Sequence, residues 1–244
     1  MLSENDLNAD GIAGGWRDTQ GFGRFRGDGS LALLSRWPID TAKARDFSDM
    51  LWQDMPGLNG AEVLSEPARA HQRLSSTSHW AVPVQYPGGE VWVLAFRVTP
   101  PVFDGPEDRN GLRNAAEVTL WRHFLDGAFG PPPDAPMILM GNANLDPAKG
   151  DGRRDAIRNL LRDPRLQDPR PDSPGGHSAN APHANTDWAE PRPGKLRVSY
   201  VLPSAHWRVL GSGVHWPAPD DPTGDPVRAA GPHRPVWAEL ALPE

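Results

Sequence analysis

The chain contains no cysteine in its 244 residues. This absence excludes disulfide bonds, thiolate catalysis and zinc sites built from cysteine. It also has no apolar run near the roughly 20 residues that a membrane-spanning helix needs. Its polar beginning, Met1-Leu-Ser-Glu-Asn-Asp, is unlike a signal peptide. We therefore expect a soluble protein without a membrane segment, in a compartment that the sequence does not indicate.

Positive charge is in deficit, because 25 Lys and Arg face 31 Asp and Glu and the net charge is −6. Non-specific binding of nucleic acid depends on neutralising phosphates over a broad basic surface. The overall charge therefore disfavours a nucleic-acid partner. The charge still allows a small cationic pocket for a phosphate-bearing or other anionic ligand. The sequence does not indicate the oligomeric state.

Two common catalytic motifs are also missing, the phosphate-cradling glycine loop and the Gly-x-Ser-x-Gly elbow. Ser75, Ser76, Ser78 and His79 lie together, but no fixed acid accompanies them. Strand spacing explains this group better than a catalytic triad does.

Proline and glycine are abundant, at 28 and 25 residues, and ten tryptophans are available for a core. So many breakers predict short strands and loops with few long helices. We expect a single domain over residues 1–244, with a loop-rich entry at 1–29 and a long Pro/Gly-rich loop at 163–195.

Apolar patterning predicts the main elements. A four-residue recurrence beginning at Leu112 indicates an amphipathic helix that ends near Gly127. Strands are expected at 30–39, 78–84, 91–98, 137–140, 196–202, 207–216 and 235–242, and helices at 112–125 and 153–162. Strands in largely antiparallel order with two helices predict an α+β fold of two packed sheets flanked by helices.

The most informative segment is Met137-Ile-Leu-Met-Gly-Asn-Ala-Asn-Leu-Asp-Pro147. Its apolar start predicts a buried strand, and Gly141 lets the backbone turn where the strand ends. The segment resembles the G-D-x-N-x-D-P signature of the endonuclease/exonuclease/phosphatase superfamily, the fold of pancreatic deoxyribonuclease. Asn142 occupies the position of the signature's first Asp.

Further motifs of that superfamily follow in the expected order. They are Gly21-Phe-Gly-Arg-Phe with Leu31-Ala-Leu-Leu-Ser-Arg-Trp-Pro-Ile39, the loop from Thr99 to Gly111 that resembles one bacterial branch, Arg197-Val-Ser-Tyr-Val-Leu-Pro-Ser204, and Gly231-Pro-His-Arg-Pro-Val-Trp237. The resemblance implies a four-layer α/β/β/α sandwich of two mixed, mainly antiparallel sheets. The family's opening strands, which supply an Asn and a metal-binding Glu, have no counterpart before Leu31. We therefore expect the sandwich to be N-terminally incomplete.

The resemblance implies metal-assisted attack of water on a phosphorus centre, with a histidine aligned by a carboxylate. His233 matches that histidine and Asn144 matches the motif Asn. Ser199 stands in place of the orienting Asp, and Arg97 stands in place of a phosphate-contacting His. Pro232 replaces a metal-binding Asp.

These substitutions remove negative charge where a dication would bind and add a permanent positive charge at Arg97, which can grip an oxyanion in a fork. We therefore expect a degenerate site at His233, Asn142 and Asn144, with Arg97 and Arg197 as anion-binding candidates. Simpler readings stay open: a core histidine, turn-capping amides and a surface ion pair. The same holds for Asp146, Asp151 and Asp155, which could cap a helix.

Asp6, Asn8 and Asp10, followed by Gly11, match the first half of a calcium-binding loop. The bidentate Glu expected at the end is replaced by Arg17, so a plain turn stabilised by Asx side chains is the alternative.

Three hypotheses for function follow. The first is a catalytically impaired relative of the metal-dependent phosphoesterases that keeps an anion-binding cleft and needs no cofactor. The second is an active, magnesium- or manganese-dependent hydrolase or nuclease whose relocated metal ligands include Asn142 and Asn144. The third is a partner-binding module. We favour the first because it follows from the altered charges.

Overall fold

A long hairpin organises the larger of two sheets. In the computed structural model, which describes residues 2–8, 10–15, 18–21, 23, 25, 27–57 and 60–242, strand β2 (Ser78–Tyr86) pairs along its whole length with β3 (Gly89–Arg97). The predicted Pro-Gly-Gly turn joins them. Arg17, Phe22 and Arg24, which belong to the predicted calcium loop and the Gly21 motif, lie outside the described residues.

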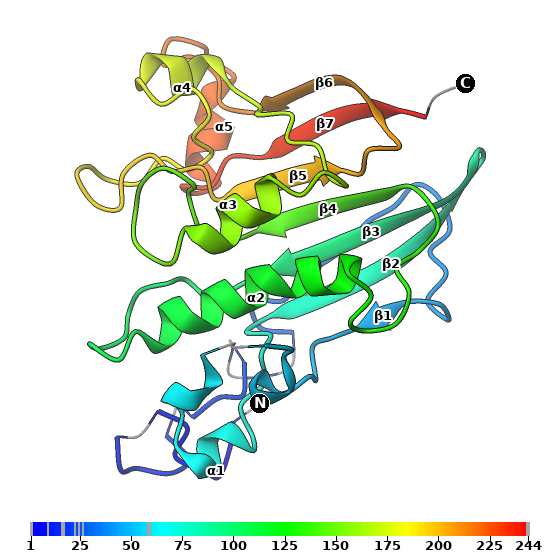
Figure 1. The fold of residues 1–244 in the computed structure, drawn as a ribbon. Coiled ribbons are helices and arrows are strands. Elements are labelled where there is room, and N and C mark those ends of the chain that lie inside the picture. Colours follow the sequence, from blue (N-terminus) through cyan, green and yellow to red (C-terminus); the bar gives the residue numbers. More distant parts are fainter. Residues whose placement is uncertain are drawn as a thin grey trace.

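The larger sheet is mixed and has the strand order β1-β2-β3-β4-β5 (Figure 1). β3 and β4 run parallel, and the other neighbours are antiparallel. A second, two-stranded sheet joins β6 and β7. Its strands and the remaining strands of the first sheet are β1 (Arg45–Asp46), β4 (Met137–Asn142), β5 (Ser199–Pro203), β6 (Arg208–Val214) and β7 (Val236–Ala241). The predicted α+β class with two sheets is confirmed.

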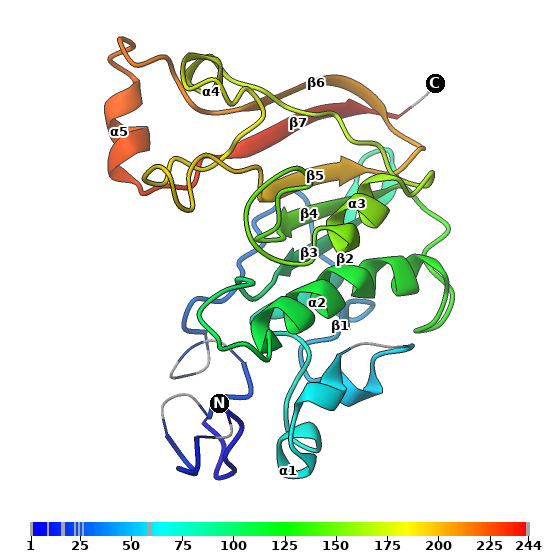
Figure 2. The same cartoon turned by 60° about the vertical axis from the view of Figure 1, so that its left-hand side comes forward.

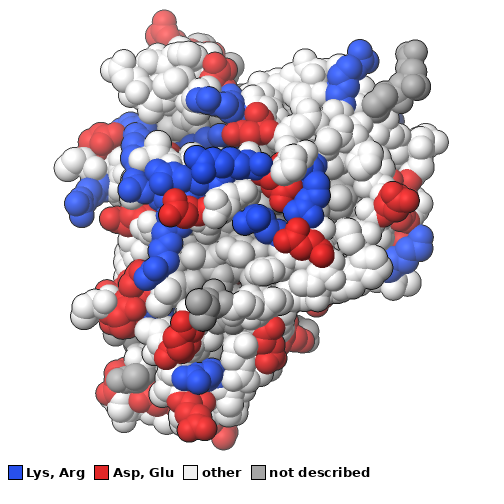
Figure 3. Space-filling model, viewed as in Figure 1, with Lys and Arg blue, Asp and Glu red and all other residues white. Residues whose placement is uncertain are grey.

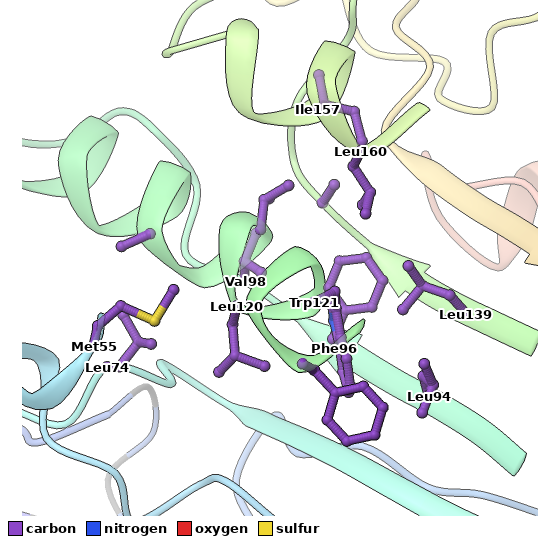
Figure 4. Packing of buried hydrophobic residues seen from close by; sticks show 14 of the residues in the cluster. Met55, Leu74, Leu94, Phe96, Val98, Leu120, Trp121, Leu139, Ile157 and Leu160 are labelled. Carbon is purple, nitrogen blue, oxygen red and sulfur yellow. The ribbon is translucent and has the colours of Figure 1, made fainter. Parts of the chain in front are cut away.

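Helices α2 (Arg109–Leu125) and α3 (Asp155–Leu161) cover one face of the larger sheet (Figures 1 and 2). Trp121 of α2 packs edge-on against Phe96 of β3, with ring centroids 6.0 Å apart. Leu139 of β4 and Ile157 of α3 are also fully buried in this cluster (Figure 4). Each such side chain stabilises the fold by about 1.5–3 kcal/mol through burial alone. Both helices were predicted.

One prediction is wrong on the opposite face of the sheet, where residues 30–39 do not form a strand. Leu31, Leu33 and Ile39 pack across the sheet face against Val84 and its neighbours, and Ile39 makes one isolated bridge to Val84. Residues 38–40 reach the edge of β2, where Gln85 N donates to Pro38 O at 2.9 Å and Asp40 N donates to Pro83 O at 3.0 Å. Pro38 lacks the N–H that further pairing needs. The predicted strand is therefore a covering segment. An open pocket of about 380 Å³ lies beside it.

Short helices complete the fold. They are η1 (Trp52–Asp54), η2 (Ala61–Val63), α1 (Glu66–Arg69), α4 (Pro174–Ser178) and α5 (Gly224–Ala229). α4 lies within the predicted long loop 163–195, whose residues Ser173, Asn185 and Thr186 are buried. The described residues among 1–29 form neither a helix nor a strand, as expected for a loop-rich entry. No helix in the described ranges is long and apolar enough to cross a membrane.

A buried polar cluster links α2 to the strands. Glu117 of α2 accepts hydrogen bonds from the backbone N–H and the hydroxyl of Ser76, at 2.6 and 2.8 Å, and from the N–H of Thr99 at 2.8 Å. His79 lies between the Ser75 hydroxyl and the backbone oxygen of Glu117. A carbonyl, rather than a carboxylate, thus meets the imidazole, which agrees with a structural reading of this group over a triad.

Burial acts on the two titratable groups of this cluster in opposite senses. Burial raises the pKa of Glu117 to about 7 from 4.5, so its contribution to stability is lost as pH rises toward 7. Burial lowers the pKa of His79 to about 3 from 6.5. The stability that the neutral imidazole contributes to the fold is therefore lost as pH falls below 6.5. Between pH 4.5 and pH 6.5 the two effects oppose each other.

Removing either group should therefore expose the pH dependence of the other. Relative to the unsubstituted protein, we expect Glu117→Gln to make the free energy of unfolding rise from pH 4.5 to pH 6.5 by roughly 2 kcal/mol. We expect His79→Gln to make the free energy of unfolding fall by a similar amount over the same pH interval. Urea denaturation at the two pH values measures both changes, and changes of the same sign in the two variants would contradict this account.

Candidate functional site

Three predicted site residues stand in one row at the end of the larger sheet. Arg97 ends β3, Asn142 ends β4 and Ser199 begins β5, and the register pairs Arg97 with Asn142 and Asn142 with Ser199. Directly paired residues on neighbouring strands share a face. Val93 and Ala95, which alternate with the core residues of β3, belong to the cluster on the face away from α2 and α3. The row therefore lies on that face.

A short backbone ladder brings His233 to this row. His233 bridges Thr186, with hydrogen bonds from Arg234 N to Asn185 O at 2.9 Å and from Asp187 N to Pro232 O at 2.8 Å. Asn185 then joins the ladder to β5. Its amide oxygen accepts the N–H groups of Val198 and Ser199, and its amide nitrogen donates to the Ser199 carbonyl. Asn185 is fully buried.

The charges that act on His233 are positive. Partial desolvation lowers the pKa of His233, and the guanidinium groups of Arg97 and Arg234 lower it further. Asp187, the acid in the ladder, forms ion pairs with Arg234 at 2.9 Å and with Lys195 at 3.5 Å. The motif resemblance predicts an orienting carboxylate at the position that Ser199 occupies. The imidazole is therefore mainly neutral near pH 7.

The two motif amides shape the turn after β4. The Asn142 side-chain oxygen accepts the N–H of Asn144 at 2.8 Å, and the Asn144 amide donates to Val98 O at 2.8 Å. Asn144 adopts a left-handed backbone with φ of 48°. Gly141 is required because a Cβ there would lie 2.0 Å from the Phe96 carbonyl oxygen. Both amides therefore cap the turn after β4, and only Asn142 belongs to the row.

The nearby Asp146 and Arg197 are engaged in the structure. Asp146 accepts the backbone N–H groups of residues 148 and 149 and of Arg197. The guanidinium of Arg197 forms a buried ion pair with Asp168 and lies 4.7 Å from the centre of the Tyr200 ring. Asp168 already balances the charge of Arg197, which weakens Arg197 as an anion-binding candidate. Asp155, at the start of α3, pairs with Arg158.

The row does not suit a divalent cation. Magnesium and manganese prefer carboxylate oxygens, whereas this row presents a guanidinium, an amide and a hydroxyl beside an imidazole. Within the described ranges, no three His, Asp or Glu side chains come close enough to share a metal ion. On the other face of the sheet, which α2 and α3 cover, Lys and Arg side chains gather around α3 (Figure 3).

The candidate calcium loop is held by its own hydrogen bonds. The carboxylates of Asp6 and Asp10 accept backbone N–H groups within the loop, and the Asn8 amide donates to Asp10 at 2.8 Å. The buried Asp18 accepts the N–H groups of residues 7 and 15. This geometry suits the alternative of an Asx-stabilised turn, and calcium binding stays a prediction.

The buried Asn185 was not identified from the sequence, and its role can be tested. Asn185→Ala leaves two N–H groups and one carbonyl of β5 without partners, so we expect it to lower the free energy of unfolding by roughly 3 kcal/mol. Asn159→Ala, at an exposed position of α3, is the control and should leave the free energy of unfolding nearly unchanged. Urea denaturation distinguishes them, and equal costs would show that the side-chain hydrogen bonds do not hold β5.

Comparison with known proteins places these features in a family. Residues 1–235 match the Endonuclease/Exonuclease/phosphatase family. No curated protein sequence matches the chain. Among solved structures, the endonuclease/exonuclease/phosphatase from Beutenbergia cavernae is 19% identical with a TM-score of 0.55, covering 85% of this chain and 46% of that one. One from Bacteroides vulgatus is 13% identical with a TM-score of 0.46, covering 84% and 67%.

The chain thus spans less than half the length of the Beutenbergia protein. The family match covers nearly all of this chain, and the strands that carry Arg97, Asn142 and Ser199 lie within it. The protein belongs to the endonuclease/exonuclease/phosphatase family.

Proposed function

We propose that this protein binds a small oxyanion, such as a phosphate group, at the row of Arg97, Asn142 and Ser199 beside His233, and that its phosphoester hydrolysis is impaired. One observation carries the proposal: the register of β3, β4 and β5 sets a permanent positive charge beside two neutral side chains. The family supplies the general chemistry, which is that of phosphoesterases.

The charge of Arg97 favours an anion over a metal cation. A dication about 5 Å from a guanidinium would be repelled by several kcal/mol even at an effective dielectric constant of about 20. A phosphate in the same place gains a charge-assisted contact, because the guanidinium presents its N–H groups as a fork. One of these groups donates to the Gly29 carbonyl at 2.7 Å, which anchors the side chain.

The side chains that could transfer protons are poorly suited to catalysing hydrolysis. Arg97 is always charged and cannot exchange a proton at neutral pH. His233 has a lowered pKa and is a poor general acid near pH 7. Without a carboxylate at position 199, charging the imidazole during the reaction is unfavourable. These residues can hold and orient an anion, but they supply little of the chemistry that the family uses to cleave it.

Isothermal titration of sulfate tests the anion site. We expect Arg97→Gln to weaken sulfate binding at least tenfold, about 1.4 kcal/mol, because one charge-assisted contact is lost. Arg208→Gln is the matched control, since Arg208 begins β6 and pairs with Ala241 at the far end of the small sheet. It should leave the affinity unchanged. Equal weakening in both variants, or none in either, would contradict the proposed site.

A further inference from the structure

Trp188 lies next to the candidate anion site. Thr186 is paired with His233 across the short ladder, and side chains alternate along such a pair. Trp188, two residues beyond Thr186, therefore lies on the same side as His233, while Asp187 and Arg234 form their ion pair on the other side. The ladder itself thus sets the indole beside the imidazole.

The two rings are in direct contact. The centroids of Trp188 and His233 are 5.1 Å apart and the ring planes cross at 86°, an edge-to-face arrangement. Trp188 is only partly buried, and the backbone carbonyl of Trp188 accepts a hydrogen bond from Lys195. A partly exposed aromatic wall is therefore anchored beside the imidazole.

His233 is close to two features that a ligand can use. The charge of Arg97 reaches the imidazole and lowers its pKa, and Trp188 contacts it by ring packing. The row of strand ends thus supplies a cation near the imidazole, and the ladder supplies an indole in contact with it. An oxyanion at Arg97 that carries a planar group could extend past His233 to the indole.

We propose that the ligand is an oxyanion with an aromatic ring attached through its ester oxygen, an aryl phosphate, and that Trp188 packs against this ring. The inference rests on the proposed anion site and adds a preference for the group that the anion carries. Aromatic surfaces favour planar partners because offset and edge-on ring contacts add to the burial of apolar area. An alkyl ester of similar charge lacks that contact.

Titration of inorganic phosphate, methyl phosphate and phenyl phosphate separates the two parts of the site. We expect the unsubstituted protein to bind phenyl phosphate roughly tenfold more tightly than methyl phosphate. Trp188→Ala should abolish this difference, weakening the binding of phenyl phosphate far more than that of methyl phosphate. Trp188→Phe keeps an aromatic surface and should retain most of the difference.

Trp37→Ala is the control, because Trp37 contacts Tyr86 at the hairpin end of the sheet, away from Arg97. It should leave both affinities unchanged. Equal binding of methyl and phenyl phosphate, or a preference that survives Trp188→Ala, would overturn the assignment of Trp188 and leave the anion site standing. Failure of all three phosphates to bind would overturn the anion site as well.

Discussion

The positive charge of Arg97 at the carboxyl end of β3 is the constraint on which the account of this site depends. Backbone pairing alone puts that charge next to Asn142, where the family motif has an aspartate and a metal ion. Electrostatic repulsion between a guanidinium and a dication that close together is strongly unfavourable. The same pairing makes the row suitable for an oxyanion. The chain thus keeps the fold and the family, and we propose that the charge of the site is opposite in sign to that of the family motif.

Buried polar side chains hold this row in place. The Asn114 amide on α2 donates to Thr99 O at 2.7 Å and to Ala143 O at 3.0 Å, which ties the segments following β3 and β4 together. Glu117, one turn further along, binds the Thr99 N–H. Asn185 performs the corresponding task for β5 and the His233 ladder. The helix that covers the apolar core therefore also positions the segments that carry the site.

The sequence predicted the parts of this fold that repeat regularly. The 78–98 hairpin, α2 and the motif strand β4 have clear apolar periods, and all three are present. Residues 30–39 have the composition of a strand, but tertiary packing lays them over the sheet instead. The roles of Asn185 and Trp188 could not be predicted, because a ladder of a few residues inside a proline-rich loop has no period. The positions at Arg97, Asn142 and Ser199 came from motif resemblance, and their alignment in one row needed the strand register.

Turnover of a chromogenic phosphodiester in the presence of manganese is the measurement that tests the central claim most directly. The unsubstituted protein and His233→Ala should be compared at equal concentration and matched purity, with folding verified for both. The account predicts the same low rate for the two proteins, because no bound cation activates water beside Arg97. A clear manganese-dependent rate that His233→Ala abolishes would contradict it.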